Sequence, residues 1–354
     1  MRLFACGSCG QTLYYENTRC ERCGHELGFA TADLALSALR PDGSVWWRLD
    51  APEGRYRRCA NTWAIGCNWL VDVDAWPGSD FCDSCALTQM KPDQSVAGNG
   101  ERWEQLERAK RRLLYGVRRL GLDLTPRSVD PGAGLAFEFL ADVPGQQPIR
   151  TGHANGVITV NIAEADAVES TRQRELMDEL YRTPLGHFRH EIGHYYWDRL
   201  VLPTPSLERF RALFGDERAD YGAAMERHYL QGPPGDWSER VVSAYASMHP
   251  WEDWAETFAH YLHIVDTLET AASFGLSVDP ALGTAPAVDK AELVDACRAP
   301  SAAALVDAWL PLTFAMNSLN RAMGLPDLYP FVLSPPVVAK LELVHQVIAE
   351  ARGG

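Results

Sequence analysis

The sequence predicts an α+β protein, in which a small cysteine-rich N-terminal region precedes a mainly helical part with a small β-sheet. Three observations support this class. Eight of the nine cysteines lie within the first 85 residues, short β-like segments occur up to about residue 162, and helix-type patterns follow to the end. A chain of 354 residues with 46% hydrophobic residues has enough apolar material for two or three folding units.

Four of the cysteines form two pairs with a gap of two residues, Cys6-x-x-Cys9 and Cys20-x-x-Cys23, each in a turn that contains glycine. Such a pair places both thiolates on one side of a tetrahedral ion, and a second pair completes the coordination. In a reducing compartment these pairs bind metal more often than they form disulfides. We therefore expect a structural zinc ribbon over residues 1–30, because so short a segment does not fold without metal. A redox dithiol is disfavoured because the βαβ context is missing.

A second set of cysteines consists of Cys59, Cys67, Cys82 and Cys85, of which only the last two form a knuckle. The set meets the four-ligand requirement of zinc. We expect a second structural zinc module over residues 31–90, in preference to unrelated buried thiols. The remaining cysteine, Cys297, is interpreted as a small buried hydrophobe.

Several elements follow from local patterns. Residues 44–49 read as a strand after the Asp42-Gly43 turn signal. The polar, glycine-rich stretch 91–100 is interpreted as a linker to a domain covering residues 101–354. An amphipathic helix is expected at about 101–121, with its basic residues on a solvent-exposed face. These basic residues are Arg108, Lys110, Arg111, Arg112, Arg118 and Arg119.

Thr183 followed by proline predicts the N-cap and first residue of a helix. On this helix His190 and His194 are four residues apart, so their rings project from one face and can bind one zinc ion. Glu191 lies beside the first ligand, where it can take the proton of a zinc-activated water and pass it to a leaving amine. The alternative interpretation is two structural histidines that hydrogen-bond to neighbours.

A catalytic zinc needs a third protein ligand and one open position, and no further histidine follows at short spacing. The best source is the segment 249–263, where a proline near a helix start puts Glu252 in the first turn and Glu256 on the same face. One of the two can bind zinc while the other holds a ligand histidine in its tautomer. Asp220 and Glu217, between the two helices, are competing ligands.

The motif His-Glu-Ile-Gly-His at 190–194, with Glu-x-x-x-Glu at 252–256, resembles the gluzincin clan of metallopeptidases. The resemblance implies that Glu252 is the third ligand and Glu256 supports a zinc histidine. In lethal-factor-type members a tyrosine seven residues before the ligand glutamate stabilises the oxyanion, which implies this role for Tyr245, with His260 as the alternative. The whole layout is similar to a family of bacterial zinc-binding metallopeptidases with an N-terminal zinc-ribbon region.

The resemblance also bears on residues 155–162, a β-branched segment upstream of the zinc helix. In zinc peptidases of this type such a strand commonly forms the sheet edge along which an extended peptide pairs. An ordinary core strand is the alternative. The resulting expectation is a mainly helical, gluzincin-like metallopeptidase domain with a small sheet, one catalytic zinc and two structural zinc ions.

Charge and hydropathy restrict the partners and the compartment. A formal net charge of −14 disfavours nucleic acid as the main partner. The N-terminus lacks a secretory signal, and no apolar run approaches the roughly 18 residues that span a bilayer. We expect a cytoplasmic enzyme without a membrane partner, whose substrate is a peptide or protein. Its rivals are a related amide hydrolase such as an isopeptidase, and a non-catalytic module that only binds peptides or proteins.

Overall fold

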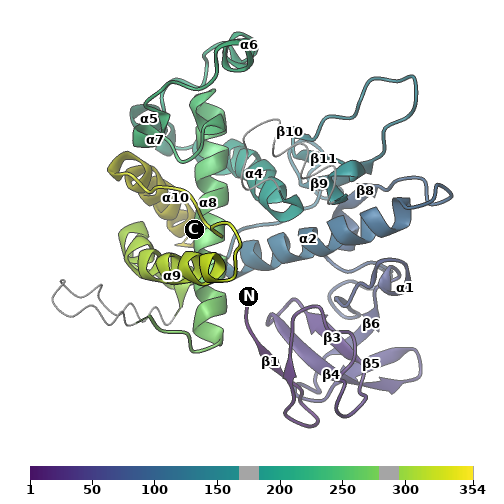
Figure 1. The fold of residues 1–354 in the computed structure, drawn as a ribbon. Coiled ribbons are helices and arrows are strands. Elements are labelled where there is room, and N and C mark those ends of the chain that lie inside the picture. The colour runs from purple at the N-terminus through teal and green to yellow at the C-terminus, as the bar shows by residue number, and fades with distance from the viewer. Residues whose placement is uncertain (167–182, 279–294, 354) are drawn as a thin grey trace. The chain divides into compact units, whose positions relative to one another are not determined.

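The computed structural model describes residues 1–166, 183–278 and 295–353. The chain divides into two compact units. Unit 1 contains residues 1–119 and 123–170, and unit 2 contains residues 120–122 and 171–354 (Figure 1). The α+β class is confirmed. Within the described residues, all strands belong to unit 1, while the regular elements of unit 2 are helices.

The N-terminal part of unit 1 consists of a short hairpin and a five-stranded antiparallel sheet. A bridge between Phe29 and Trp69 brings the last strand back to the first, so the sheet closes on itself. Gly43 has a φ of 60°, as a two-residue hairpin turn requires, and the strand predicted after it is confirmed. The strands of the hairpin are β1 (Phe4–Ala5) and β2 (Thr12–Leu13), and those of the sheet are β3 (Leu27–Ala30), β4 (Ala35–Asp42), β5 (Val45–Arg48), β6 (Arg55–Arg58) and β7 (Leu70–Asp72). Short helices α1 (Thr62–Ile65) and η1 (Cys85–Leu87) follow within the second cysteine set.

A second, four-stranded sheet has the order β10-β11-β9-β8. Strand β11 pairs antiparallel with β10 and parallel with β9, so both of its edges are used. The interpretation of residues 155–162 as an edge for a substrate peptide is therefore wrong, and the core-strand alternative holds. The physical reason is the Asn155-Gly156 turn, whose φ values of 50° and 84° return β10 onto β11. The strands are β8 (Thr88–Met90), β9 (Ala136–Leu140), β10 (Gly152–Ala154) and β11 (Val157–Asn161), and η2 (Ile162–Ala165) follows.

Helix α2 (Asn99–Arg119) lies between the two sheets of unit 1 (Figure 1). On one side, the hydroxyl of Tyr15 donates to the carbonyl of Arg111 at 3.0 Å. On the other side, the ammonium of Lys110 lies over the rings of Phe137 and Phe139. The predicted linker at residues 91–100, and the domain boundaries on either side of it, stay predictions. Helix α2 begins at Asn99, within the predicted linker, and belongs to the same unit as both sheets.

The prediction of a solvent-exposed basic face on this helix is wrong for two of its residues. Lys110 and Arg111 are buried. Lys110 forms an ion pair with buried Glu107 at 2.9 Å, and Arg111 donates to the carbonyl of Ile65. These charges are buried because each has a partner inside unit 1, which offsets the cost of removing it from water.

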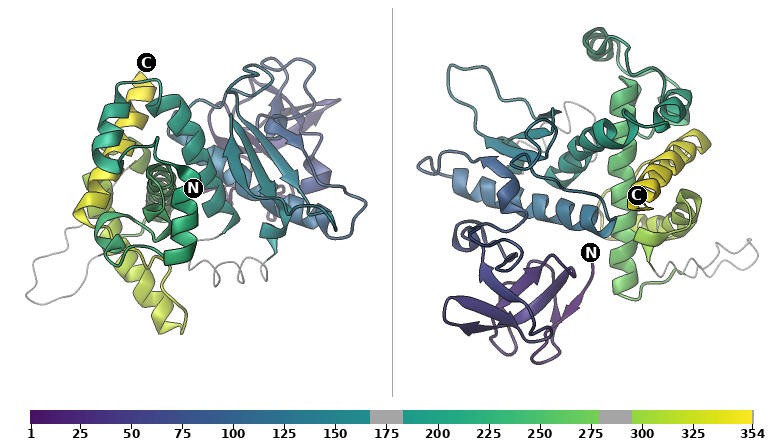
Figure 2. Two further views of the ribbon diagram at one scale, coloured as in Figure 1. Left: turned by 90° about the horizontal axis from the view of Figure 1, so that it is seen from above. Right: turned by 180° about the vertical axis from the view of Figure 1, so that it is seen from behind.

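Unit 2 is a set of helices around the central helix α8 (Pro250–Ser273). Seen from above in Figure 2, α8 is nearly end-on with the other helices arranged around it. Both predicted helix starts are confirmed: Thr183 caps α4 by accepting from the amide of Gly186 at 3.0 Å, and α8 begins at Pro250 with His249 as its N-cap. The other elements are α4 (Pro184–Tyr196), the π-helical turn η3 (Trp197–Val201), α5 (Ser206–Phe214), α6 (Tyr221–Gln231), α7 (Trp237–Arg240), η4 (Tyr245–Ser247), η5 (Ala296–Arg298), α9 (Ala302–Ala322) and α10 (Pro335–Gly353).

Helix α9 is long and apolar enough, by length and composition, to cross a membrane. The sequence analysis considered only uninterrupted apolar runs, and polar residues such as Asp307 interrupt the apolar stretch of α9. Half of the apolar stretch in α9 is buried, and helices in the cores of soluble proteins have the same length and composition. Asn317 in this helix makes two hydrogen bonds to the backbone of Tyr329, which ties α9 to its own unit.

Candidate metal centre

The centre is built where α4 and α8 approach each other closely. A Cβ atom added at Gly193 would lie 3.0 Å from Cα of Ala255, so only glycine allows this approach. The indole of Trp254 donates to the carbonyl of Gly193 at 3.0 Å and fixes the contact. The two histidines of α4 therefore face the first turn of α8.

Three side chains converge at this contact. Nε2 of His190 lies 3.1 Å from Nε2 of His194 and 3.0 Å from Oε2 of Glu252. The last of these atoms is 3.5 Å from Nε2 of His194. All three side chains are buried. One ion could contact all three atoms, because they lie within 4.8 Å of one another.

The position of Glu256 separates it from this donor set. Its Oε1 lies 2.7 Å from Nδ1 of His190, on the opposite side of the ring, and Ser243 donates to its Oε2 at 2.6 Å. With Nδ1 carrying the hydrogen, Nε2 presents its lone pair to the position shared with His194 and Glu252. The geometry thus favours Glu252 as the third donor, and Glu256 as the residue that holds His190 in the required tautomer.

Glu191 lies next to the donor set with one oxygen held and one available. Nε2 of His187, one helical turn earlier, lies 3.3 Å from Oε1 of Glu191. Within the described residues, the buried Oε2 of Glu191 has no hydrogen-bond partner. This oxygen can therefore accept a hydrogen bond or a proton from a group brought to the site.

The electrostatics of the centre favour a cation. Burial opposes charge on His190, but Glu252 and Glu256 outweigh it and raise its pKa well above the ordinary value. Burial likewise raises the pKa of Glu256, yet the hydrogen bond to His190 lowers it to about 2. The two buried carboxylates therefore favour a positive charge beside them, either on His190 itself or on a bound cation. A divalent ion held by the three donors would supply such a charge.

The two tyrosines at the centre come from the stretch between α4 and α8. The ring of Tyr245, on η4, lies 6.0 Å from the ring of His190. Tyr221, at the start of α6, donates its hydroxyl to Oε1 of Glu252 at 2.9 Å. The sequence analysis missed Tyr221, because nothing in its spacing relates it to the histidine motif.

The competing ligands from this stretch are not brought to the centre. Asp220 is the N-cap of α6 and accepts from the amide of Ala223 at 2.9 Å. Glu217 forms an ion pair with Arg211 at 2.5 Å. Both carboxylates are explained by local structure, so neither competes with Glu252.

The remaining histidines of α8 have structural surroundings. His260 is buried, and its Nδ1 lies 2.7 Å from the hydroxyl of Tyr329. This contact does not favour His260 as the alternative oxyanion stabiliser. Nδ1 of His263 lies 2.5 Å from the guanidinium of Arg189, which also pairs with Asp266.

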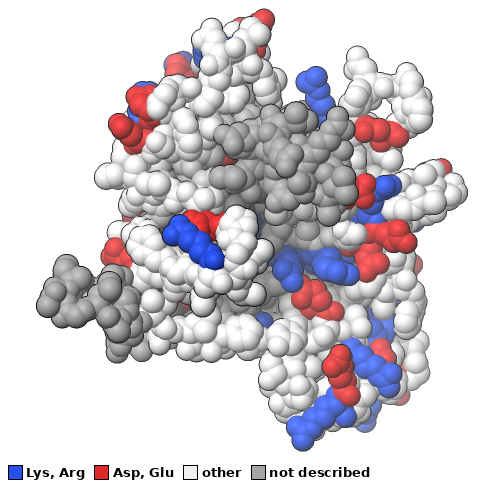
Figure 3. Space-filling model, viewed as in Figure 1, with Lys and Arg blue, Asp and Glu red and all other residues white. Residues whose placement is uncertain are grey.

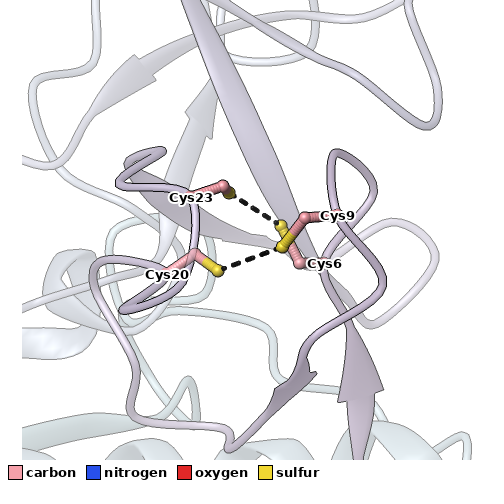
Figure 4. Close-up of side chains that lie close together, drawn as sticks. All are labelled: Cys6, Cys9, Cys20 and Cys23. Carbon is pink, nitrogen blue, oxygen red and sulfur yellow. Dashed lines mark hydrogen bonds between the residues drawn. The ribbon is translucent and has the colours of Figure 1, made fainter.

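The first cysteine set is assembled as the spacing predicts. The sulfur atoms of Cys6 and Cys23 are 3.6 Å apart, and those of Cys9 and Cys20 are 3.7 Å apart (Figure 4). Zinc–sulfur bonds of about 2.3 Å in a tetrahedron separate the sulfurs by roughly 3.8 Å, whereas a disulfide requires about 2.05 Å. The spacing fits a four-thiolate zinc site.

The second cysteine set is equally compact. The sulfur of Cys67 lies 3.7 Å from that of Cys82 and 3.8 Å from that of Cys85. Cys59 completes a buried group whose sulfurs all lie within 4.8 Å of one another. The wide gap between Cys59 and Cys67 therefore does not prevent a closed site.

Comparison with known proteins identifies the family. Residues 99–347 match the model of a family described as "Putative zinc-binding metallo-peptidase", and residues 3–96 match a zinc-ribbon domain. The chain belongs to this zinc-binding metallopeptidase family. Uncharacterized proteins of Mycobacterium tuberculosis and Mycobacterium bovis are 46% identical over 353 residues, which cover 99% of this chain and 96% of each relative. No solved structure matches the chain significantly.

Membership of this metallopeptidase family agrees with the chemistry of the three donor sets. Two imidazoles and one carboxylate, with a fourth position open, are the ligands of a catalytic zinc, and four thiolates are those of a structural zinc. The residues present at all three places therefore fit zinc.

On the face drawn in Figure 3, acidic and basic side chains of the described residues are interspersed.

Proposed function

We propose that the chain is a zinc-dependent peptidase that hydrolyses peptide bonds, with Glu191 as its general base. The observation that carries the proposal is the juxtaposition at the α4–α8 contact. His190, His194 and Glu252 present three donor atoms to one position, and the partnerless oxygen of Glu191 lies on the residue next to His190. A zinc ion held by these donors would supply Lewis-acid chemistry, lowering the pKa of water and polarising a carbonyl group.

The side chains around the donors have separate tasks in this proposal. Glu191 takes the proton of the attacking water and passes it to the leaving amine. His187 holds the other oxygen of Glu191, so that the base keeps one orientation. The hydroxyl of Tyr245 donates to the developing oxyanion. Glu256 keeps His190 in the tautomer that the donor set needs.

The proposed substrate is a peptide or protein, and the proposed compartment is the cytoplasm. The zinc-ribbon match covers residues 3–96, and the thiolates of both cysteine sets fit closed structural sites. Hydrolysis is therefore assigned to unit 2. The rival, a module that binds peptides without cleaving them, lacks a reason for a buried, partnerless carboxylate oxygen beside the donor set.

The test compares wild type with Glu191→Gln on a library of unstructured peptides, read by mass spectrometry. Glutamine keeps the size of the side chain but cannot accept the proton, so we expect kcat to fall by about 10²–10⁴. Zinc content should stay at the wild-type value, since Glu191 is not a ligand. A zinc-loaded wild type that cleaves no peptide would favour the binding module, and an active Glu191→Gln variant would refute the assigned base.

A further inference from the structure

Tyr221, which lies in the stretch between α4 and α8, contacts one residue of the donor set. Its hydroxyl donates to Oε1 of Glu252 at 2.9 Å. The other carboxylate oxygen, Oε2, is the atom that faces Nε2 of His190 at 3.0 Å. The two oxygens of Glu252 therefore have different partners, one a tyrosine and the other the position that the imidazoles share.

The N-terminus of α6 fixes the backbone position of Tyr221. Asp220 caps this helix by accepting from the amide of Ala223 at 2.9 Å, which makes Tyr221 its first residue. The ring of Tyr221 also lies 5.3 Å from the ring of His249. The tyrosine is thus held at both its backbone and its ring.

His249 joins the start of α6 to the start of α8. Its Nδ1 accepts from the amide of Trp251 at 3.1 Å, so Nε2 carries the hydrogen and donates to the carbonyl of Ala219 at 3.1 Å. One side chain therefore caps the helix that carries Glu252 and anchors the residues that precede Tyr221. This arrangement leaves little freedom in the contact between Tyr221 and Glu252.

We propose that Tyr221 is a positioning residue of the metal centre, which holds Oε1 of Glu252 and so keeps Oε2 directed at the position shared by His190 and His194. The inference rests on the metal site of the proposed function. A carboxylate without this hydrogen bond can rotate and present either oxygen. Groups that orient a ligand in this way typically change metal affinity by about 10–100-fold when they are removed.

The test is zinc affinity of Tyr221→Phe, measured by competition with a chromophoric chelator. Phenylalanine keeps the ring contacts and removes only the hydroxyl. We expect the affinity of the site to fall by about 10–100-fold. The His190→Ala variant defines the zinc that the cysteine sites hold. Tyr229→Phe is the matched control, since it removes an exposed tyrosine hydroxyl from the same helix, and its zinc affinity should equal that of wild type.

A second variant tests whether His249 helps to hold Tyr221 in position. His249→Asn retains a capping oxygen for α8 but is too short to reach Ala219. We expect a smaller loss of zinc affinity than in Tyr221→Phe. In the double variant the loss should not exceed that of Tyr221→Phe alone, because both substitutions release the same contact.

Wild-type zinc affinity in Tyr221→Phe would overturn the proposal. A loss of affinity would also overturn it if Tyr221→Phe lowers the melting temperature of the His190→Ala variant, in which the cysteine sites keep their zinc, because looser packing would then explain the loss. Weaker zinc binding with an unchanged melting temperature supports it. This result would stand even if the zinc-loaded wild type cleaved no peptide, so failure of the peptidase function and failure of the positioning role are distinguishable.

Discussion

Glu191 has two oxygens in different surroundings, and the difference explains how a buried carboxylate can act as a base. Oε1 lies 3.3 Å from Nε2 of His187, whereas the buried Oε2 has no partner among the described residues. Burial raises the pKa of Glu191, but the hydrogen bond with His187 and the charge interactions with His190, His187 and His194 outweigh it and lower the pKa. The carboxylate is therefore ionised and has one oxygen available for a proton.

His187→Ala tests the role of this histidine at the level of single residues. Loss of the partner lets Glu191 rotate, so we expect kcat to fall by roughly tenfold, with KM unchanged and zinc retained. Steady-state kinetics on a cleaved peptide provide the measurement. His187→Gln keeps a donor of similar reach and should recover part of the loss. Unchanged kcat in His187→Ala would show that Glu191 is oriented without it.

A second residue-scale prediction concerns pH. Burial lowers the pKa of His260 from 6.5 to about 4. Below pH 6.5 the unfolded chain takes up a proton that the folded chain refuses until about pH 4, so the stability of unit 2 falls as pH decreases through this window. The loss attributable to this side chain is roughly 3 kcal/mol.

Chemical denaturation of the zinc-free protein between pH 7 and 4 measures this effect. His260→Gln removes the titration while keeping an acceptor for the hydroxyl of Tyr329. We expect its stability to depend less steeply on pH than that of wild type. Identical pH dependence in the two proteins would contradict the assignment of a neutral, buried His260.

The residues of the site differ in how far their sequence context reveals them. His190, Glu191 and His194 are predictable because one helical turn brings their side chains together. Glu252 follows from its place in the first turn of a helix. Tyr221 is not predictable, because it precedes Glu252 by 31 positions. The two residues meet only because His249, at the start of α8, contacts Ala219 just before α6.

At the scale of elements, the α4–α8 contact depends on Gly193. Gly193→Ala would place a Cβ atom 3.0 Å from Cα of Ala255 and 3.2 Å from Cβ of Phe258, so α4 and α8 must shift by a few tenths of an ångström. We expect the free energy of unfolding of unit 2 to fall by about 1–3 kcal/mol. Zinc affinity should fall as well, since the donors come from both helices.

Gly235→Ala is the matched control for this prediction, because an added Cβ atom there meets nothing within 4 Å. Chemical denaturation and chelator competition on both variants supply the measurements. We expect Gly235→Ala to change stability by no more than about 0.5 kcal/mol. Equal behaviour of the two variants would show that close packing at Gly193 does not position the donors.

The first residues of helices are easier to predict from the sequence than the elements with which a strand or helix pairs or packs. The sequence analysis placed the starts of α4 and α8 correctly, since capping depends on neighbouring residues. It expected residues 155–162 to form a sheet edge from a family resemblance, with a core strand as the alternative. The edge was wrong because strand order depends on β9 and β10, which no local pattern places beside β11. The Asn155-Gly156 turn was the available signal for β10. Burial of Lys110 depended likewise on another element, since its ammonium lies over the rings of Phe137 and Phe139 in β9.

At the scale of the whole molecule, the α+β class and the family were predictable, because cysteine pairs and the histidine motif are local patterns. The packing of unit 1 was not, since α2 fills the space between a sheet before it and a sheet largely after it. The two cysteine sets belong to unit 1 and the His-His-Glu set to unit 2. The two four-thiolate donor sets and the His-His-Glu donor set therefore lie in different units of the chain.

The central claim is that unit 2 binds one zinc ion through His190, His194 and Glu252. Its most direct test is the zinc content of purified wild type beside His190→Ala and Glu252→Ala, measured by mass spectrometry of the metal. We expect about three zinc ions per chain, two from four-thiolate sites and one from this centre, with one lost in each variant. Full zinc content in Glu252→Ala would refute the third ligand. Full zinc content in His190→Ala as well would contradict the metal centre itself.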